Sequence, residues 1–452
     1  MSQAGGPSAA SQGSWERTRR VLRLAVPSAG EALLGMMVGL VSTYLVGHLG
    51  AASLTAVGLS AQWAMTAMIL FTAVGTGATA LIARMVGAED WSGANRVVVQ
   101  SLAVAFGLGA VASALLFVLA EPALRLMGAE EEALAQGVMY LRMVSSAYAV
   151  SAVMGIGNAC MRGAGDARTP LLVMAVVNAV NVVLAWVLVR GAGPVPALGL
   201  RGAALGDVTG RVAGGVLVVL LLARGRAGLR LEWHGPDLEI VRRMLRVGLP
   251  AALDQLIFRL GMLAYIRVVS ALGTVAFAAH QIALNGESIS FMPGWGFAMA
   301  ATTLVGQGLG ARDDERAERD ALLSFYVAAG FMSCMGVAFL LWAPQIIGLF
   351  TEEAEVIVLA TTPLRLIAVV QPFLAAMMVF AGGLRGAGDT LTPMVVNGLS
   401  VWLLRVPLSL LVTRWLGWGL TGVWLVMALD LTVRGTVLYA QFRGGRWKRV
   451  QV

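Results

Sequence analysis

The sequence predicts an all-α integral membrane protein with twelve transmembrane helices arranged in two lobes of six. First, 58% of its 452 residues are hydrophobic and only 13% are charged, whereas soluble proteins carry roughly 25% charged residues. Second, the apolar residues form runs of about 20 residues, the length that crosses a bilayer. Third, the second half of the chain repeats motifs of the first half at a constant spacing.

The apolar runs define the expected helices. They lie at residues 21–46, 54–83, 97–119, 133–158, 170–189, 200–222, 244–269, 277–306, 320–342, 356–381, 393–412 and 418–440. Arginines precede the first run and recur between runs 2 and 3, 4 and 5, and 6 and 7, and at the C-terminus, while the loops after runs 3 and 9 read GAEEEA and TEEAE. Positively charged loops stay in the cytoplasm, so we expect both termini there.

The segments outside the helices complete the expected organisation. We expect a cytoplasmic tail at 1–20, an N-lobe at 21–222, a cytoplasmic linker at 223–243, a C-lobe at 244–440 and a second cytoplasmic tail at 441–452. The segment 1–15 lacks the apolar core of a signal peptide. The net charge of +8 lies in the loops rather than on one face, which argues against a nucleic-acid partner. The isolated Cys160 and Cys334 form no metal or redox motif.

An internal duplication is the strongest signal in the sequence. LRGAGDTLTP at 384–393 follows MRGAGDARTP at 161–170 at an offset of 223, and the same offset relates Pro27 to Pro250 and Glu31 to Asp254. In the sixth helix, GLRG at 199–202 and GLTG at 419–422 indicate 220 instead, so the register there is ambiguous. Six helices per repeat is an even number, so the repeats are parallel and related by a pseudo-two-fold axis along the membrane normal. We expect a substrate cleft between the lobes.

The repeated GAGDxxTP motif predicts a local structure. Its threonines, Thr169 and Thr392, can cap the following helices, with proline at the first helical position. Its aspartates, Asp166 and Asp389, are expected to accept hydrogen bonds from the loop backbone. We therefore read the motif as a structural turn rather than a gate.

These motifs together resemble the MATE family, the multidrug and toxic compound extrusion transporters. The resemblance spans residues 18–450 and rests on P-x(15)-T-x-x-V-G-x-L-G at 27–50, AAHQIALNGESISFMPGWGF at 278–297, LVGQGLGARDDERA at 304–317, the doubled RGAGDxxTP, and WLLRVPLSLL followed by GLTGVWLVMALD. It implies a twelve-helix fold in the plasma (inner) membrane of a prokaryote. It also implies export of amphipathic, often cationic compounds in exchange for H⁺ or Na⁺.

The chain departs from the family at its best-known carboxylates. The helix 1 aspartate of many members is Ser42 here, and the helix 5 aspartate of archaeal-type members is Ala185. The helix 7 glutamate and helix 10 aspartate of one bacterial group align with Phe258 and Leu374. The family's ion mechanism therefore cannot be carried over unchanged.

Three other acids become the candidates for ion coupling, with Asp254 and Glu287 of the C-lobe expected to carry it and Glu31 to assist. Glu31, Asp254 and Glu287 lie within predicted helices, and an intramembrane charge costs several kcal/mol unless it faces a cavity or a partner. Each can instead be a hydrogen-bonded packing residue. Arg259, in the same helix as Asp254, can pair with Asp254 or Glu287 and either quench or tune the site.

Candidate substrate contacts are aromatic, methionine and amide side chains of the predicted cleft. They are Asn285, Arg259, Gln62, Asn178, Asn181, Phe258, Tyr265, Phe291 and Met292. Many such residues face lipid or core instead. The i,i+4 pairs Asp207–Arg211 and Asp430–Arg434 are read as structural, and His280 as a hydrogen-bonded core residue.

The sequence thus predicts a secondary multidrug antiporter rather than an enzyme. It contains no GxxxxGK[ST] nucleotide motif, so we expect an ion gradient as energy source, no cofactor and no metal. H⁺ is favoured over Na⁺, because a proton needs a single carboxylate. The expected partners are small amphipathic drug-like substrates and membrane lipid, and we expect a monomer. The alternative is a flippase for a lipid-linked saccharide or peptidoglycan precursor; a channel is disfavoured because nothing resembles a selectivity filter.

Overall fold

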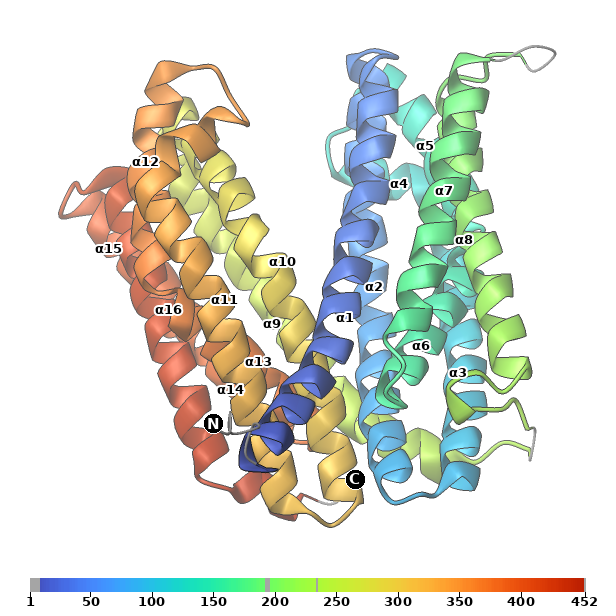
Figure 1. Ribbon diagram of the computed structural model, residues 1–452. Coiled ribbons are helices and arrows are strands. Elements are labelled where there is room, and N and C mark those ends of the chain that lie inside the picture. Colours follow the sequence, from blue (N-terminus) through green and yellow to red (C-terminus); the bar gives the residue numbers. More distant parts are fainter. Residues whose placement is uncertain (1–8, 192–195, 233–234, 451–452) are drawn as a thin grey trace, which may run out of the picture. The chain divides into compact units, whose positions relative to one another are not determined.

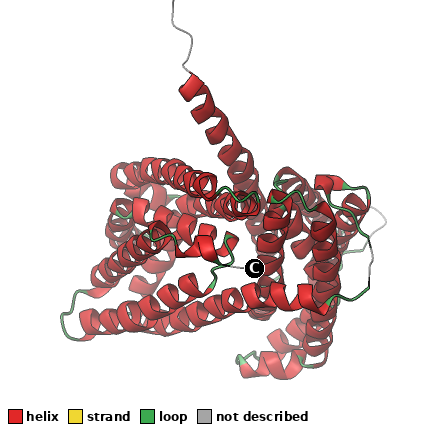
Figure 2. Cartoon of the chain, turned by 90° about the horizontal axis from the view of Figure 1, so that it is seen from below, coloured by secondary structure: helices red, strands yellow, loops and turns green. Residues whose placement is uncertain are grey.

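The computed structural model describes residues 9–191, 196–232 and 235–450. Every regular element within these ranges is a helix, and none is a strand (Figure 2). The all-α fold class is therefore confirmed. The predicted positions of the termini relative to the membrane remain a prediction.

The first repeat contains eight α-helices (Figure 1). They are α1 (Ala9–Gly47), α2 (Ala51–Gly87), α3 (Trp91–Val118), α4 (Ala120–Leu126), α5 (Glu131–Ser145), α6 (Tyr148–Gly163), α7 (Arg168–Arg190) and α8 (Leu200–Ala223). The short α4 follows α3, and α5 and α6 form one span bent by 50°. A 3₁₀ turn, η1 (Arg226–Gly228), follows α8.

The second repeat follows the same order. Its elements are α9 (Leu238–Ser270), α10 (Thr274–Gly310), α11 (Asp314–Gly348), α12 (Ala354–Val369), α13 (Gln371–Gly386), α14 (Leu391–Leu399), the π-helical turn η2 (Ser400–Arg405), α15 (Val406–Arg414), α16 (Gly419–Arg443) and η3 (Arg446–Arg449). The pair α12 and α13 forms a span bent by 60°. Pro372 lies in the first turn of α13, where its missing N–H interrupts the helical ladder.

The expected spans are found with one informative exception. Within the described residues, nine helices and two bent pairs are long and apolar enough to cross a membrane. The remaining expected span is α10, which carries His280, Asn285 and Glu287 along its length. Polar residues in a membrane helix face the protein interior, so α10 is the helix in which to look for a site.

Helical structure extends into both predicted tail segments. Helix α1 begins at Ala9, so residues 9–20 extend the first helix, and residues 1–8 lie outside the described residues. At the other end, α16 continues to Arg443, inside the predicted tail 441–452. Trp447 is fully buried and stacks on Phe442 with ring centres 4.6 Å apart. The C-terminal segment thus completes a hydrophobic core rather than leaving it.

The chain forms two compact units, and the borders between them fall at equivalent positions of the two repeats. The C-terminal unit comprises the chain up to Ala29 and from Leu253 onward, and the N-terminal unit comprises Gly30–Ala252. The two borders are related by the repeat offset of 223, and each lies just after a helix proline, Pro27 or Pro250. Each unit therefore contains the first part of the other repeat's first helix, unlike the predicted lobes 21–222 and 244–440.

Close backbone packing holds these exchanged segments. In the C-terminal unit, Gly296 of α10 lies against the backbone of Ala25 and Ala29. In the N-terminal unit, Gly248 of α9 lies against the backbone of Ala73. At the repeat offset of 223, Gly296 corresponds to Ala73 and Gly248 corresponds to Ala25. The two contacts are therefore equivalent, but the glycine lies on the second helix of the repeat in one and on the first helix in the other. A Cβ at either glycine would clash with a carbonyl group, so only glycine fits.

The structure also removes the ambiguity in the sixth helix of each repeat. Gly199 and Gly419, where α8 and α16 begin, both have φ of 54°, and Gly225 and Gly445, just after these helices, are both left-handed with φ of 75° and 72°. Both glycine pairs have an offset of 220. The Asp207–Arg211 and Asp430–Arg434 pairs have an offset of 223 instead, so they occupy non-equivalent positions. Glycines of α8 take the places that correspond to Asp430 and Arg434.

The GAGDxxTP turns reverse the predicted capping roles. Asp166 accepts the N–H of Thr169 at 3.0 Å, and Asp389 accepts the N–H of Thr392 at 3.0 Å. The threonine hydroxyls donate to the same carboxylates at 2.6 and 2.7 Å. The aspartates therefore satisfy the free N–H groups at the helix start. The prediction that the threonines cap the helices was wrong, whereas the predicted aspartate–backbone bonds are confirmed.

Candidate functional site

Each repeat places one acidic residue of its first helix against an arginine. Arg162 donates to Glu31 at 2.6 Å, and Arg385 donates to Asp254 at 2.6 Å. Both arginines belong to the RGAGD motif, and both pairs are related by the repeat offset of 223. The predicted pairing of Asp254 is thereby resolved: its ion pair is with Arg385, at the end of α13.

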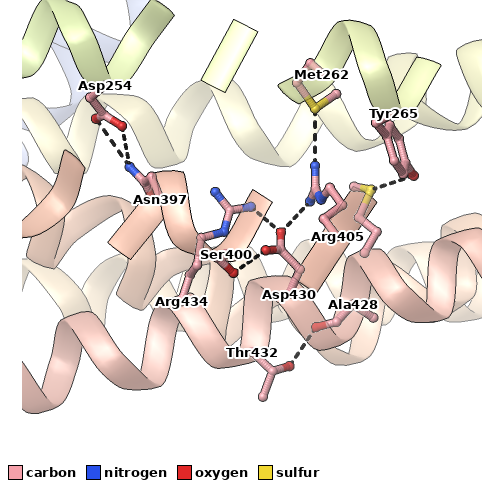
Figure 3. Close-up of polar contacts among 11 residues, drawn as sticks. Asp254, Met262, Tyr265, Asn397, Ser400, Arg405, Ala428, Asp430, Thr432 and Arg434 are labelled. Atoms are coloured by element: carbon pink, nitrogen blue, oxygen red, sulfur yellow. Dashed lines mark hydrogen bonds and ion pairs between the residues drawn. The ribbon is translucent and has the colours of Figure 1, made fainter. Parts of the chain in front are cut away.

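The two pairs differ in burial and in a third partner. The Asp254 side chain is 5% exposed, against 15% for Glu31. Asn397 of α14 donates its amide to both oxygens of Asp254, at 3.0 and 3.3 Å (Figure 3). The residue that corresponds to Asn397 in the first repeat is Met174, which cannot donate. Asp254 is therefore held from two helices and Glu31 from one.

A second cluster of charges lies inside the C-terminal unit, at α16 and η2 (Figure 3). Asp430 Oδ2 accepts from Arg434 at 2.6 Å and from Arg405 at 2.9 Å. Asp430 Oδ1 accepts from the hydroxyl of Ser400. All three charged side chains are at most 4% exposed. Buried charges persist in a membrane protein only with such partners.

The π-helical turn is what brings Arg405 into this cluster. Helix α7 is continuous, whereas its counterpart is interrupted at Ser400–Arg405. The buried residues Asn181 and Ala185 of α7 correspond to buried Arg405 and Ser409 at an offset of 224, one more than before the turn. A π turn adds one residue to a helix without changing its direction. Arg405 therefore occupies the position that Asn181 has in the first repeat.

Glu287 is the buried acid without an arginine bound to it. It is 6% exposed and forms no ion pair with any described residue. The positive charges of Arg405 and Arg434 act on it, and Tyr265 lies within its electrostatic range. On the α13 side of α10, Ser290 donates to Gln371 at 2.8 Å, and both residues are uncharged.

Aromatic residues close one side of this region. Trp424 Nε1 donates to His280 Nδ1 at 3.1 Å, so the neutral imidazole carries its hydrogen on Nε2. His280 packs edge-on against Tyr265, and the Arg405 guanidinium lies 5.4 Å from the Tyr265 ring centre. The arrangement agrees with His280 as a hydrogen-bonded core residue.

The interior of the N-terminal unit is polar but carries fewer charges. Arg211 donates to Asp207 at 3.0 Å, as predicted for an i,i+4 pair. Asn178 donates to the carbonyl of Leu34 at 2.9 Å. Asn181 is fully buried, and neither amide atom of its side chain has a hydrogen-bond partner among the described residues.

The remaining predicted contact residues are scattered. The Arg434 guanidinium carbon lies 5.7 Å from the centre of the Phe258 ring. Phe291, Met292 and Arg259 are half-buried, whereas Asn285 and Gln62 are exposed. The described residues contain no group of three or more histidine, cysteine or acidic side chains that could hold a metal ion.

Three arginines of the site escaped the sequence analysis. Arg162 and Arg385 were read only as parts of a loop motif, although each follows its acid at the same separation of 131. Arg405 stands inside the apolar run WLLRVPL. An arginine in such a run needs a buried partner, which was the available signal.

Comparison with known proteins identifies the repeat and the fold. The family model MatE matches the chain twice, at residues 27–187 and 250–411. The two matches begin at Pro27 and Pro250, which are one repeat offset apart, so the family unit is the same repeat that the sequence contains.

Several known proteins are similar to the whole chain. A probable multidrug resistance protein NorM of Thermotoga maritima is 30% identical over 436 residues, which cover 96% of this chain and 94% of that protein. An uncharacterized transporter, YisQ, of Bacillus subtilis is 25% identical and covers 99% of both chains. A solved outward-facing structure of a multidrug resistance MATE family transporter superposes with a TM-score of 0.88 at 25% identity, over 96% of this chain and 97% of that chain.

Proposed function

Because the chain belongs to the MATE family of multidrug and toxic compound extrusion transporters, we propose that it is a secondary active antiporter that exports amphipathic cationic compounds in exchange for protons. Glu287 is proposed as the principal proton carrier. Asp254 and Glu31, each paired with an arginine, are proposed to assist Glu287 in ion coupling.

The absence of an ion pair at Glu287 carries this proposal. Glu31 and Asp254 each have an arginine at 2.6 Å as a direct ion-pair partner. Glu287 is about as buried as Asp254 and more buried than Glu31, but it has no such partner among the described residues. No bound arginine therefore fixes the charge of the Glu287 carboxyl group, unlike those of Glu31 and Asp254.

A count of formal charges supports exchange of a proton for a cation. Asp430 balances one of the two arginines, Arg405 and Arg434. With Glu287 protonated, the cluster has one excess positive charge, and with Glu287 ionised it is neutral. A cationic substrate bound near ionised Glu287 restores the same single positive charge. Proton and substrate therefore compete for one unit of negative charge.

The same residues favour protons over sodium and drugs over pyrophosphate. Sodium needs several converging oxygen ligands, whereas two arginines act on Glu287. Ser42 and Ala185 stand where the family resemblance places a pair of N-lobe aspartates that could supply such ligands. For the flippase alternative, a pyrophosphate group requires a strongly basic pocket, whereas Asp430 already neutralises one of the two arginines of this cluster. The aromatic and methionine side chains of Phe258, Tyr265, Phe291 and Met292 suit flat apolar compounds.

Proton release from the purified protein tests this function. Addition of a fluorescent organic cation such as ethidium to detergent-solubilised wild-type protein in weak buffer should release protons. Glu287→Gln should abolish the release while still binding the dye, because the apolar contacts remain. Asp254→Asn and Glu31→Gln serve as comparison variants and should reduce the release less. Sodium-dependent dye affinity without proton release would instead assign sodium coupling.

A further inference from the structure

The π-helical turn η2 carries a tryptophan in the middle of a membrane span. Trp402 lies midway between Leu391 and Arg414, the ends of the apolar span formed by α14, η2 and α15, and it is 43% exposed. Tryptophans that face lipid are enriched at the two membrane interfaces rather than at mid-span. Trp415, just beyond the end of the same span and 82% exposed, fits that belt. Trp402 does not, so its exposed surface needs another explanation.

The indole N–H of Trp402 is anchored to helix α9. Its Nε1 donates to the carbonyl of Ile257 at 3.2 Å. A Cβ at Gly261, one turn farther along α9, would lie 3.4 Å from the same nitrogen, so the N–H edge of the ring abuts the α9 backbone. A polar N–H group at membrane depth needs such an acceptor. The anchor fixes the orientation of the ring, and the exposed surface lies on its remaining, apolar part.

The first repeat has the equivalent anchor without the ring. Asn178 of α7 donates to the carbonyl of Leu34 of α1 at 2.9 Å. Leu34 corresponds to Ile257 at the offset of 223, and Asn178 corresponds to Trp402 at 224, the offset that also applies to Arg405. Asn178 is buried, so a short amide is sufficient to connect the two helices. The large ring at position 402 is therefore an addition that the anchor does not require.

We propose that Trp402 contacts substrate, with its exposed ring face stacked against the flat aromatic part of an exported cation. A ring whose orientation is already fixed loses little freedom on binding, and a ring face attracts a positive charge. Helical turns of the π type are frequent at functional sites. Phe258, which is predicted to contact substrate, directly follows Ile257 in α9. The inference deepens the proposed function and rests on it.

Two substitutions separate the ring from the anchor. Trp402→Asn copies the first repeat, keeps a hydrogen-bond donor and removes the ring, so it should weaken ethidium binding by about tenfold or more. Trp402→Phe keeps a ring and removes the donor, so its dissociation constant should stay within about threefold of wild type. Trp415→Asn is the matched control outside the span and should bind ethidium like wild type. Fluorescence anisotropy in detergent measures binding, and thermal unfolding verifies that each variant is folded.

Energy transfer from tryptophan to bound ethidium gives a second readout. If the dye stacks on Trp402, this tryptophan is the nearest donor. With dye at saturation, Trp402→Phe should therefore reduce the transfer by more than the equal share of one residue among 12 tryptophans. Trp415→Phe should reduce it by no more than that share. Equal losses in the two variants would overturn the proposal, and this comparison decides the matter if Trp402→Asn does not fold.

The outcomes separate this inference from the function on which it rests. If Trp402→Asn binds ethidium like wild type, the ring faces lipid only and the inference is wrong. It is also wrong if Trp402→Phe weakens binding as much as Trp402→Asn, because the anchor to α9 would then matter rather than the ring. Neither result affects the antiporter assignment, which fails if Glu287→Gln still releases protons. In Trp402→Asn, the number of protons released per bound dye should stay at the wild-type value.

Discussion

Both repeats hold an acid of their first helix with an arginine at 2.6 Å, yet they bury different groups farther along. In the N-terminal unit, α7 buries Asn181, whose side-chain amide has no hydrogen-bond partner among the described residues. The sixth helix of that repeat, α8, contributes the Asp207–Arg211 ion pair. In the C-terminal unit the position that matches Asn181 is Arg405, bound to Asp430. The acid–arginine pairs, which both repeats keep, involve acids that lie just after the points where the chain passes from one unit to the other. The features that differ are candidates for chemistry.

The physical cause of the difference is local. The π turn at Ser400–Arg405 adds one residue to the fifth helix of the second repeat, and the positions of α8 that match Asp430 and Arg434 are occupied by glycines. Glycine there allows α8 to approach α7 closely: a Cβ at Gly210 would meet the Val177 carbonyl. In the first repeat, α8 therefore packs closely against the backbone of α7, whereas at the matching positions of the second repeat Asp430 forms ion pairs with Arg405 and Arg434. This division agrees with the proposed assignment of ion coupling to the C-terminal unit.

The largest expected effect comes from breaking the shared ion pairs. Arg385→Ala leaves Asp254 buried with only Asn397, and loss of one partner of a buried pair costs about 3–5 kcal/mol. Arg162→Ala should cost less, because Glu31 is three times as exposed. Thermal unfolding in detergent measures both. The double variant Asp254→Asn/Arg385→Gln removes both charges and should recover most of the loss; a larger loss for Arg162→Ala would break the comparison.

A medium effect is expected where the pairs differ. Asn397→Met copies the first repeat and removes two hydrogen bonds to Asp254, at an expected cost of about 1–3 kcal/mol. The reciprocal change, Met174→Asn, offers Glu31 a donor and should stabilise by at most about 1 kcal/mol. Melting temperatures of the two variants and their combination measure this. Equal effects of both single variants in the same direction would show that position 174 does not correspond to position 397.

The sequence alone predicted the fold because a duplication is read from spacing. The offset of 223 paired Glu31 with Asp254 correctly, and the i,i+4 spacing predicted Asp207–Arg211 and Asp430–Arg434. It could not predict the site, for physical reasons. An ion pair between residues at a separation of 131 depends on helix packing. The one-residue shift of the π turn is hidden in the sequence because most residues of SVWLLRVPLSL are apolar. The sequence also did not show that the first helix begins as early as Ala9, because residues 9–20 read as polar.

The smallest expected effect tests the interior of the N-terminal unit. Asn181 is fully buried with both amide atoms unsatisfied among the described residues, and an unpaired buried amide is destabilising by about 1–3 kcal/mol. Asn181→Leu, nearly equal in size, should therefore leave the melting temperature unchanged or raise it. If Asn181 contacts substrate, as predicted from the sequence, the same variant should weaken ethidium binding while proton release per bound dye stays at the wild-type value. Arg405→Leu, at the matching position, should instead lower stability and disturb proton release, because Asp430 loses a bound arginine and a positive charge that acts on Glu287 is removed. If Asn181→Leu changes the number of protons released per dye, coupling is shared between the units, and the division drawn between them is wrong.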